Sequence, residues 1–97
     1  MTQADLLVLL KADLNQMYPD AIRLAQLQHL LRVALQRISR EGVTLQEPFS
    51  AEDGGLIVEY AAYLFRKRAT NEPMPRDLRY ALNNRIFSEK AGGQNAP

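Results

Sequence analysis

Residues 53–85 read DGGLIVEYAAYLFRKRATNEPMPRDLRYALNNR. Apolar residues recur at helical spacing in the first part of this stretch and again after its second proline. The basic run 66–68 suits the end of the first helix, because cations are favoured at the negative end of the helix dipole. Pro75 suits the first turn of the second helix. The segment therefore predicts two amphipathic helices and a short break. Their expected buried stripe is Leu56, Ile57, Tyr60, Ala61, Leu64, Leu78 and Leu82.

Two further helices are expected upstream. Residues 3–16 carry leucines at helical spacing, and Thr2 with Asp5 suits a capping box. Tyr18-Pro19-Asp20 is expected to break this first helix. A longer helix is expected from about residue 20 to residue 40, with Pro19 suited to its first position. Gly42 fits the left-handed residue that closes such a helix. With no strand-like alternation, the chain is predicted to be all-α, a small bundle of about four helices.

The connector over residues 43–52 contains apolar residues that suit a short extended piece covering the core, while Pro48 argues against a central strand. The helix after it is expected to begin near Ser50, with Asp53 as capping partner. Gly54 and Gly55 lower helix propensity there. Either another backbone approaches them closely, or the helix begins after them.

The length of 97 residues suits one domain, which we expect to span residues 1–90. Residues 91–97, AGGQNAP, carry no apolar side chain large enough to anchor them and are expected to form a flexible tail. The sequence has no cysteine, as is common in a reducing compartment. No apolar run approaches the roughly 18 residues of a membrane span, and the first residues lack the basic start of a signal peptide. A soluble protein is expected.

No constellation of residues predicts catalysis. His29 is the only histidine, and acid–base work by histidine usually needs an oriented partner. Without cysteine, one histidine cannot supply a zinc ligand set. Asp5, Asp13 and Asp20 are best explained as helix-end carboxylates. The Gly54–Gly55 pair lacks the lysine and further glycines of a phosphate loop. We therefore expect no enzyme, no metal and no cofactor.

The strongest candidate site is a basic and tyrosine-rich surface in the second half of the chain. Arginine presents a rigid donor fork that suits carboxylates and phosphates, and tyrosine and arginine are enriched at interface hot spots. Such a surface suits an acidic protein or a nucleic-acid backbone. Tyr60 and Phe65 are expected in the core. The predicted interface residues are Tyr63, Arg66, Lys67, Arg76, Arg79, Tyr80 and Arg85.

Charge is unevenly distributed along the chain. Residues 1–53 carry five basic and seven acidic residues, a net charge of −2. Residues 54–97 carry seven basic and four acidic residues, a net charge of +3. Opposite signs suit head-to-tail docking of subunits, the acidic half of one against the basic half of the next. A charged surface that is simply solvated fits the same numbers.

The chain resembles the head–tail connector (adaptor) proteins of long-tailed bacteriophages and related prophages. The resemblance covers most of residues 3–88 and rests on a tyrosine-rich helix, a Met-Pro turn and a Leu-Arg/Leu-Asn helix in that order. The matching residues are Leu56, Ile57, Tyr60, Ala61, Leu64, Arg68, Met74, Pro75, Arg76, Leu78, Arg79, Leu82 and Asn83, and residues 24–42 fit the family's long central helix. The connector over residues 43–53 is shorter and more acidic than in the family.

This resemblance implies a non-catalytic structural protein of the virion, made in the bacterial host cytoplasm. It implies a homo-oligomeric ring around a channel through which DNA passes. The partners implied are a portal protein on one side and a stopper or tail-completion protein on the other.

A small helix-turn-helix regulator that binds DNA is the alternative. The helix after Pro75 offers Arg79, Asn83, Asn84 and Arg85 as base or phosphate contacts. The predicted break of about six residues, with two prolines and no glycine, is longer than the usual three- or four-residue turn. The net charge of +1 is low for a DNA-binding protein.

Overall fold

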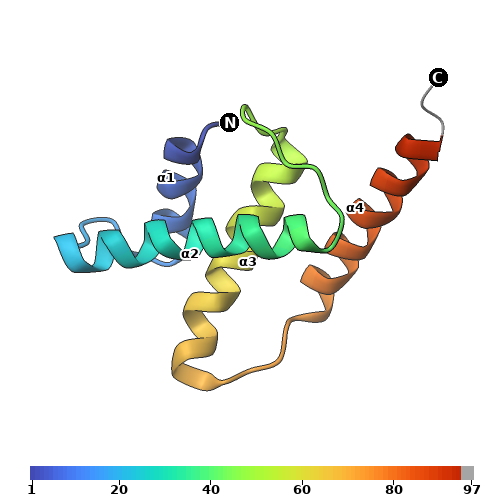
Figure 1. The fold of residues 1–97 in the computed structure, drawn as a ribbon. Coiled ribbons are helices and arrows are strands. Elements are labelled where there is room, and N and C mark those ends of the chain that lie inside the picture. Colours follow the sequence, from blue (N-terminus) through green and yellow to red (C-terminus); the bar gives the residue numbers. More distant parts are fainter. Residues whose placement is uncertain (95–97) are drawn as a thin grey trace.

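The computed structural model describes the backbone of residues 1–94 and the side chains of residues 1–91. Its four helices are α1 (Gln3–Asp13), α2 (Ala21–Arg40), α3 (Ala51–Thr70) and α4 (Arg76–Gln94), and no strand occurs within these residues. The all-α prediction is confirmed. α2 crosses α3, and α1 packs against both of these helices. α4 lies on the opposite side of α3 from α1 (Figure 1). The molecule is elongated, with extents of 48 × 28 × 18 Å.

α1 begins as expected and ends early. The Thr2 hydroxyl accepts from the Asp5 amide, and the Thr2 amide donates to the Asp5 carboxylate at 2.9 Å, which completes the capping box. The Thr2 amide also holds the pKa of the Asp5 carboxyl below its ordinary value. The helix stops at Asp13 instead of residue 16, because Asn15 takes a left-handed backbone with φ 57°.

α2 begins at Ala21, and Asp20 is its cap. The Asp20 carboxylate accepts from the Arg23 amide at 2.7 Å. Pro19 therefore precedes the cap, and the prediction that it occupies the first helical position was wrong. Gly42 closes the helix with φ +102°, as predicted.

α3 begins at Ala51, so both glycines lie inside it. The Ser50 hydroxyl accepts from the Asp53 amide at 3.0 Å, as expected for the cap. A Cβ on Gly54 would lie 2.6 Å from the Met1 sulfur, so a close approach explains this glycine. The neighbour is a side chain and not the backbone that we expected. A Cβ on Gly55 would meet nothing within 4 Å.

The connector between α2 and α3 covers the core, as predicted. Val43 and Phe49 are buried and Leu45 is half-buried. The Phe49 amide donates to the Met1 carbonyl at 2.7 Å, and the Met1 amino group donates to the Phe49 carbonyl at 2.8 Å. This reciprocal pair ties the first residue to the segment that leads into α3.

One hydrophobic core runs through the described part of the chain. It buries the whole predicted stripe together with leucines of α1 and α2. Burying one such side chain contributes about 1.5–3 kcal/mol relative to leaving it exposed. The largest side chains with almost no exposure are Leu6, Leu10, Leu27, Ile38, Ile57 and Leu82.

α4 attaches mainly through Leu78 and Leu82, which are its only buried residues among those with described side chains, and it packs chiefly against α3. It continues through Gln94 and so extends into the segment 91–97 for which a flexible tail was expected. The rest of that predicted tail, residues 95–97, lies outside the described residues. Within residues 1–94, no helix combines the length and the apolar character that a membrane crossing requires.

Candidate functional site

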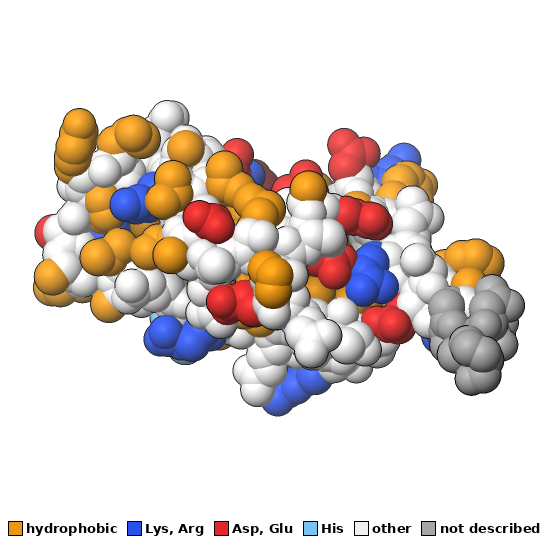
Figure 2. All heavy atoms as spheres, turned by 90° about the horizontal axis from the view of Figure 1, so that it is seen from above, with side chains coloured by type: hydrophobic (Ala, Val, Ile, Leu, Met, Phe, Trp, Pro, Cys, Tyr) orange, Lys and Arg blue, Asp and Glu red, His pale blue; other side chains and the backbone are white. Residues whose placement is uncertain are grey.

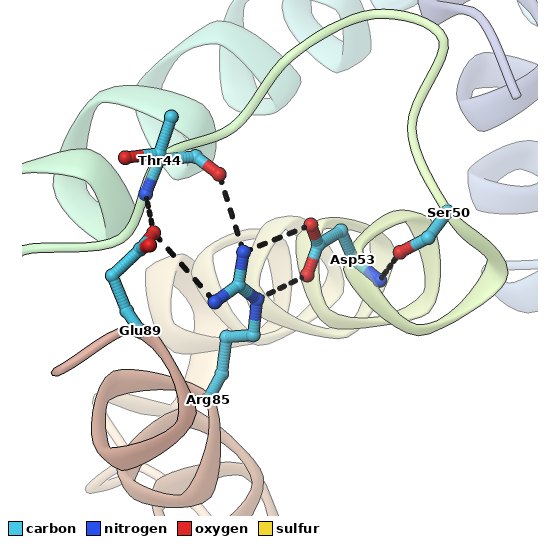
Figure 3. A network of polar contacts seen from close by, with 5 residues as sticks. All are labelled: Thr44, Ser50, Asp53, Arg85 and Glu89. Atoms are coloured by element: carbon cyan, nitrogen blue, oxygen red, sulfur yellow. Dashed lines mark hydrogen bonds and ion pairs between the residues drawn. The ribbon is translucent and has the colours of Figure 1, made fainter. Parts of the chain in front are cut away.

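Arg85 holds three parts of the chain together (Figure 3). Its Nε donates to Asp53 at 2.7 Å, and its terminal nitrogen donates to the Thr44 carbonyl at 3.2 Å. A second terminal nitrogen lies 3.6 Å from Glu89, one turn further along α4. Glu89 in turn accepts a hydrogen bond from the Thr44 amide. Arg85 thus joins α4 to the connector and to the first turn of α3.

These contacts shift two pKa values. The hydrogen bond to Asp53 is the largest cause of the raised pKa of Arg85, which stays charged throughout the accessible pH range. The Thr44 amide holds the pKa of the Glu89 carboxyl below its ordinary value. Only 16% of the Arg85 side chain and 13% of the Asp53 side chain remain exposed. Arg85, predicted as an interface residue, therefore acts inside the fold.

Two more candidate arginines also bind acidic residues of the same chain. Arg79 pairs with Glu41 at 3.1 Å and also donates to Asn83 at 3.2 Å. Arg66 lies 3.5 Å from Asp13, with about half of each side chain exposed. The acidic first half and the basic second half thus meet within one subunit. Three acidic residues that were expected to attract a neighbouring subunit, Asp13, Glu41 and Asp53, are therefore paired within their own subunit.

Tyr63 is a core residue, although it was predicted at the interface. It is buried, its ring meets the edge of Tyr60 with centroids 6.2 Å apart, and its hydroxyl donates to the Glu72 carbonyl at 3.4 Å. Lys67 lies over the same ring, with its Nζ 5.8 Å from the centroid. Tyr60 is buried as expected, while Phe65 is half-buried beneath the guanidinium of Arg23.

Of the predicted interface residues, Lys67, Arg76 and Tyr80 are exposed and form no ion pair among the described residues. Tyr80 has an apolar neighbour on the same side of α4, because Phe87 follows seven residues later, two helical turns along. Phe87 is 74% exposed. We call Tyr80 and Phe87 the α4 outer face.

A second exposed apolar group lies at the opposite end of the molecule. Met17, Tyr18 and Ile22 occupy the connector between α1 and α2 and the first turn of α2, at the left of Figure 1. Tyr18 is 97% exposed and Ile22 is 84% exposed. We call these three residues the α1–α2 end. Figure 2 shows apolar side chains gathered on that side of the molecule.

The sequence reasoning missed the α1–α2 end because Tyr18-Pro19-Asp20 was interpreted only as a helix break. The sequence did contain a signal for this surface. Helix capping explains Asp20, but it does not explain why the large apolar residues Tyr18 and Ile22 lie on either side of it. Contiguous exposed apolar patches mark interaction sites in soluble proteins.

The residues that were considered for catalysis, metal binding or DNA contacts do not lie together in one site among the described residues. His29 lies on α2 beside Val33 and Leu30, with no acidic neighbour lining the same hollow. Within the described residues, no three His, Cys, Asp or Glu side chains are placed to hold a metal ion. Arg79, Asn83 and Arg85, three of the four proposed DNA contacts on α4, are engaged in the intramolecular contacts given above. The break between α3 and α4 is residues 71–75.

Comparison with protein-family models, with curated proteins and with solved structures finds no match to this chain.

Proposed function

We propose that the protein is a structural subunit of a phage or prophage particle. In this proposal it joins the portal of the head to the tail, as one member of a ring around the channel for DNA. One side of the ring contacts the portal protein and the other contacts a stopper or tail-completion protein. The residues that carry the resemblance to head–tail connectors support this role.

The observation that carries the proposal is the pair of exposed apolar surfaces on an elongated subunit. Figure 1 shows that the elements carrying them, the start of α2 and α4, lie at opposite ends. Subunits in a ring make heterologous contacts, in which one patch meets a different patch on the next copy. The α1–α2 end and the α4 outer face provide two such patches, each with a large apolar side chain that is mostly exposed. Tyrosine, present in both, is enriched at interface hot spots.

Ion pairs within the subunit affect how strongly charge can hold neighbouring subunits together. Asp13, Glu41 and Asp53 already have arginine partners in their own subunit. These pairs reduce the charge that is available for attraction between the acidic half of one subunit and the basic half of the next. Burial of apolar surface adds to the contact, at about 25 cal/mol per Å² removed from water.

Site-specific cross-linking tests the heterologous contact. The natural chain has no cysteine, so single-cysteine variants give unambiguous products. We expect a short bis-maleimide to link Ile22→Cys to Phe87→Cys when the two variants are mixed, and to link neither variant to itself. Gln36→Cys, exposed on α2 and outside both surfaces, is the control. Self-linking of either variant would show a two-fold contact instead, and no mixed product above the control would contradict the proposal.

The helix-turn-helix alternative has no observation in its favour. A regulator needs free base-reading side chains on α4, whereas Arg79 and Arg85 bind Glu41 and Asp53. A DNA shift with log affinity falling linearly in log salt, abolished by Asn83→Ala, would restore this alternative.

A further inference from the structure

A groove with an apolar floor runs between α2 and the last turns of α3. Its volume is about 550 Å³. Leu30 and Val33 of α2 and Leu64 of α3 form its floor. Leu30 and Leu64 belong to the hydrophobic core, and Val33 packs against that core from its edge. The groove is therefore a place where the core comes close to the surface.

The rim of the groove is basic. Arg37 contributes from α2, and Lys67 and Arg68 contribute from the end of α3, with His29 at the same rim and no acidic residue in the lining. Two of the three rim cations, Lys67 and Arg68, belong to the basic run 66–68 at the end of α3.

The rim charges lack acidic partners among the described residues. The four ion pairs found there involve Arg66, Arg79 and Arg85 only. Lys67 lies over the Tyr63 ring, a contact that leaves its charge uncompensated. When the amide of Gln26 is oriented with its oxygen toward Arg68, the guanidinium donates to that neutral group. Three fixed positive charges thus surround an apolar floor.

We propose that this groove binds an acidic amphipathic helix of a partner protein. Carboxylates on such a helix would complement the three rim cations, and its apolar side chains would cover the floor. A nucleic-acid backbone would complement the charges but would gain nothing from Leu30, Val33 and Leu64. The groove shares no residue with the α1–α2 end or the α4 outer face, so this inference goes beyond the proposed ring and does not depend on it.

The probe is a synthetic peptide of about 15 residues, roughly four helical turns, with leucines at i, i+4, i+7 and i+11 and glutamates on the flanks. Binding of the fluorescein-labelled peptide to the full chain is followed by anisotropy. We expect saturable binding that weakens about tenfold or more in Arg37→Glu/Arg68→Glu. The control Arg76→Glu/Lys90→Glu makes the same change in net charge at exposed positions of α4. It is expected to bind within about twofold of the natural chain.

Two further probes separate the possible occupants. A scrambled peptide of identical composition, which cannot present an apolar face, is expected to bind clearly more weakly than the amphipathic peptide. A 12-base-pair DNA duplex is expected to bind more weakly than the amphipathic peptide. Circular dichroism confirms that both double variants remain folded, and a single Arg37→Gln variant replaces the double variant if they do not.

Four results would overturn the inference. In the first, the amphipathic peptide does not bind at millimolar protein. In the second, both double variants weaken binding of the peptide equally, which shows that net charge alone causes the effect. The scrambled peptide binds as well, which removes the role of the floor. The duplex binds more tightly and loses affinity in Arg37→Glu/Arg68→Glu, which makes the groove a nucleic-acid site. Ring assembly is scored separately, so a failed ring with a working groove, or the reverse, is recognised as such.

Discussion

Replacing Arg85 by alanine removes the polar contacts that join this part of α4 to Asp53 and to the Thr44 carbonyl. The guanidinium makes two hydrogen bonds to Asp53, at 2.7 and 3.4 Å, and one to the Thr44 carbonyl at 3.2 Å. Breaking a fully buried pair costs about 3–5 kcal/mol, whereas an exposed pair contributes about 0–1 kcal/mol. The side chains of Arg85 and Asp53 are 16% and 13% exposed, so this pair lies nearer the buried case.

We expect Arg85→Ala to lower the free energy of unfolding by about 2–3 kcal/mol. In a domain of this size each kcal/mol shifts Tm by about 4–8 °C, so Tm should fall by roughly 10–20 °C. Urea denaturation followed by circular dichroism measures the change. Arg76→Ala is the matched control, because Arg76 is an exposed arginine at the start of the same helix, and it should change stability by less than about 0.5 kcal/mol.

A double-mutant cycle isolates the pair. Asp53→Ala and Arg85→Ala together should cost less than the sum of the two single changes, with a coupling energy of at least about 1 kcal/mol. Equal effects of Arg85→Ala and Arg76→Ala, or strict additivity in the cycle, would refute the claim that Arg85 is a structural residue.

Other changes probe the remaining parts of the fold. Gly55→Ala should stabilise the protein by about 0.5–1 kcal/mol, whereas Gly54→Ala should lose that gain to its clash with Met1; equal thermal melting of the two variants would contradict the close approach of the Met1 side chain to Gly54. Leu82→Ala should cost about 2–5 kcal/mol, and α4 amides should exchange hydrogen before those of α2; uniform exchange would argue against the weak attachment of α4. The lowered pKa of Glu89 means that its contribution to stability is complete above about pH 4.5 and is lost as the pH falls through the folded-state pKa. Glu89→Gln should therefore reduce the slope of stability against pH in acid, and an unchanged slope in urea titrations would contradict the Thr44 contact.

The order and type of the helices could be predicted because each start and stop has a local cause. Ser50 and Asp20 cap helices through their own side chains, and Gly42 adopts the left-handed backbone that a glycine allows. The end of α1 was predicted three residues too late because Asn15 adopts the left-handed conformation. Asparagine tolerates this conformation, but its presence in a sequence does not predict it.

The candidate site was predicted less well, because ion pairing depends on tertiary geometry. Nothing local to Arg85 indicates that Asp53, on another helix, lies 2.7 Å from it. Tyr63 was predicted at the interface, but the α3–α4 break and the start of α4 lie beside it, and its hydroxyl donates to the Glu72 carbonyl. Tyr18 was treated as a helix break because exposure depends on what packs against a residue, which a single sequence does not contain.

Negative-stain imaging of the purified protein, alone at high concentration and mixed with the portal protein encoded in the same genome, tests whether the subunits assemble into a ring. We expect closed rings in at least the mixture, and we expect Ile22→Ser with Phe87→Ser to prevent them while leaving the helical content unchanged. Monomers under both conditions, or rings that persist in the double variant, would contradict assembly through the α1–α2 end and the α4 outer face.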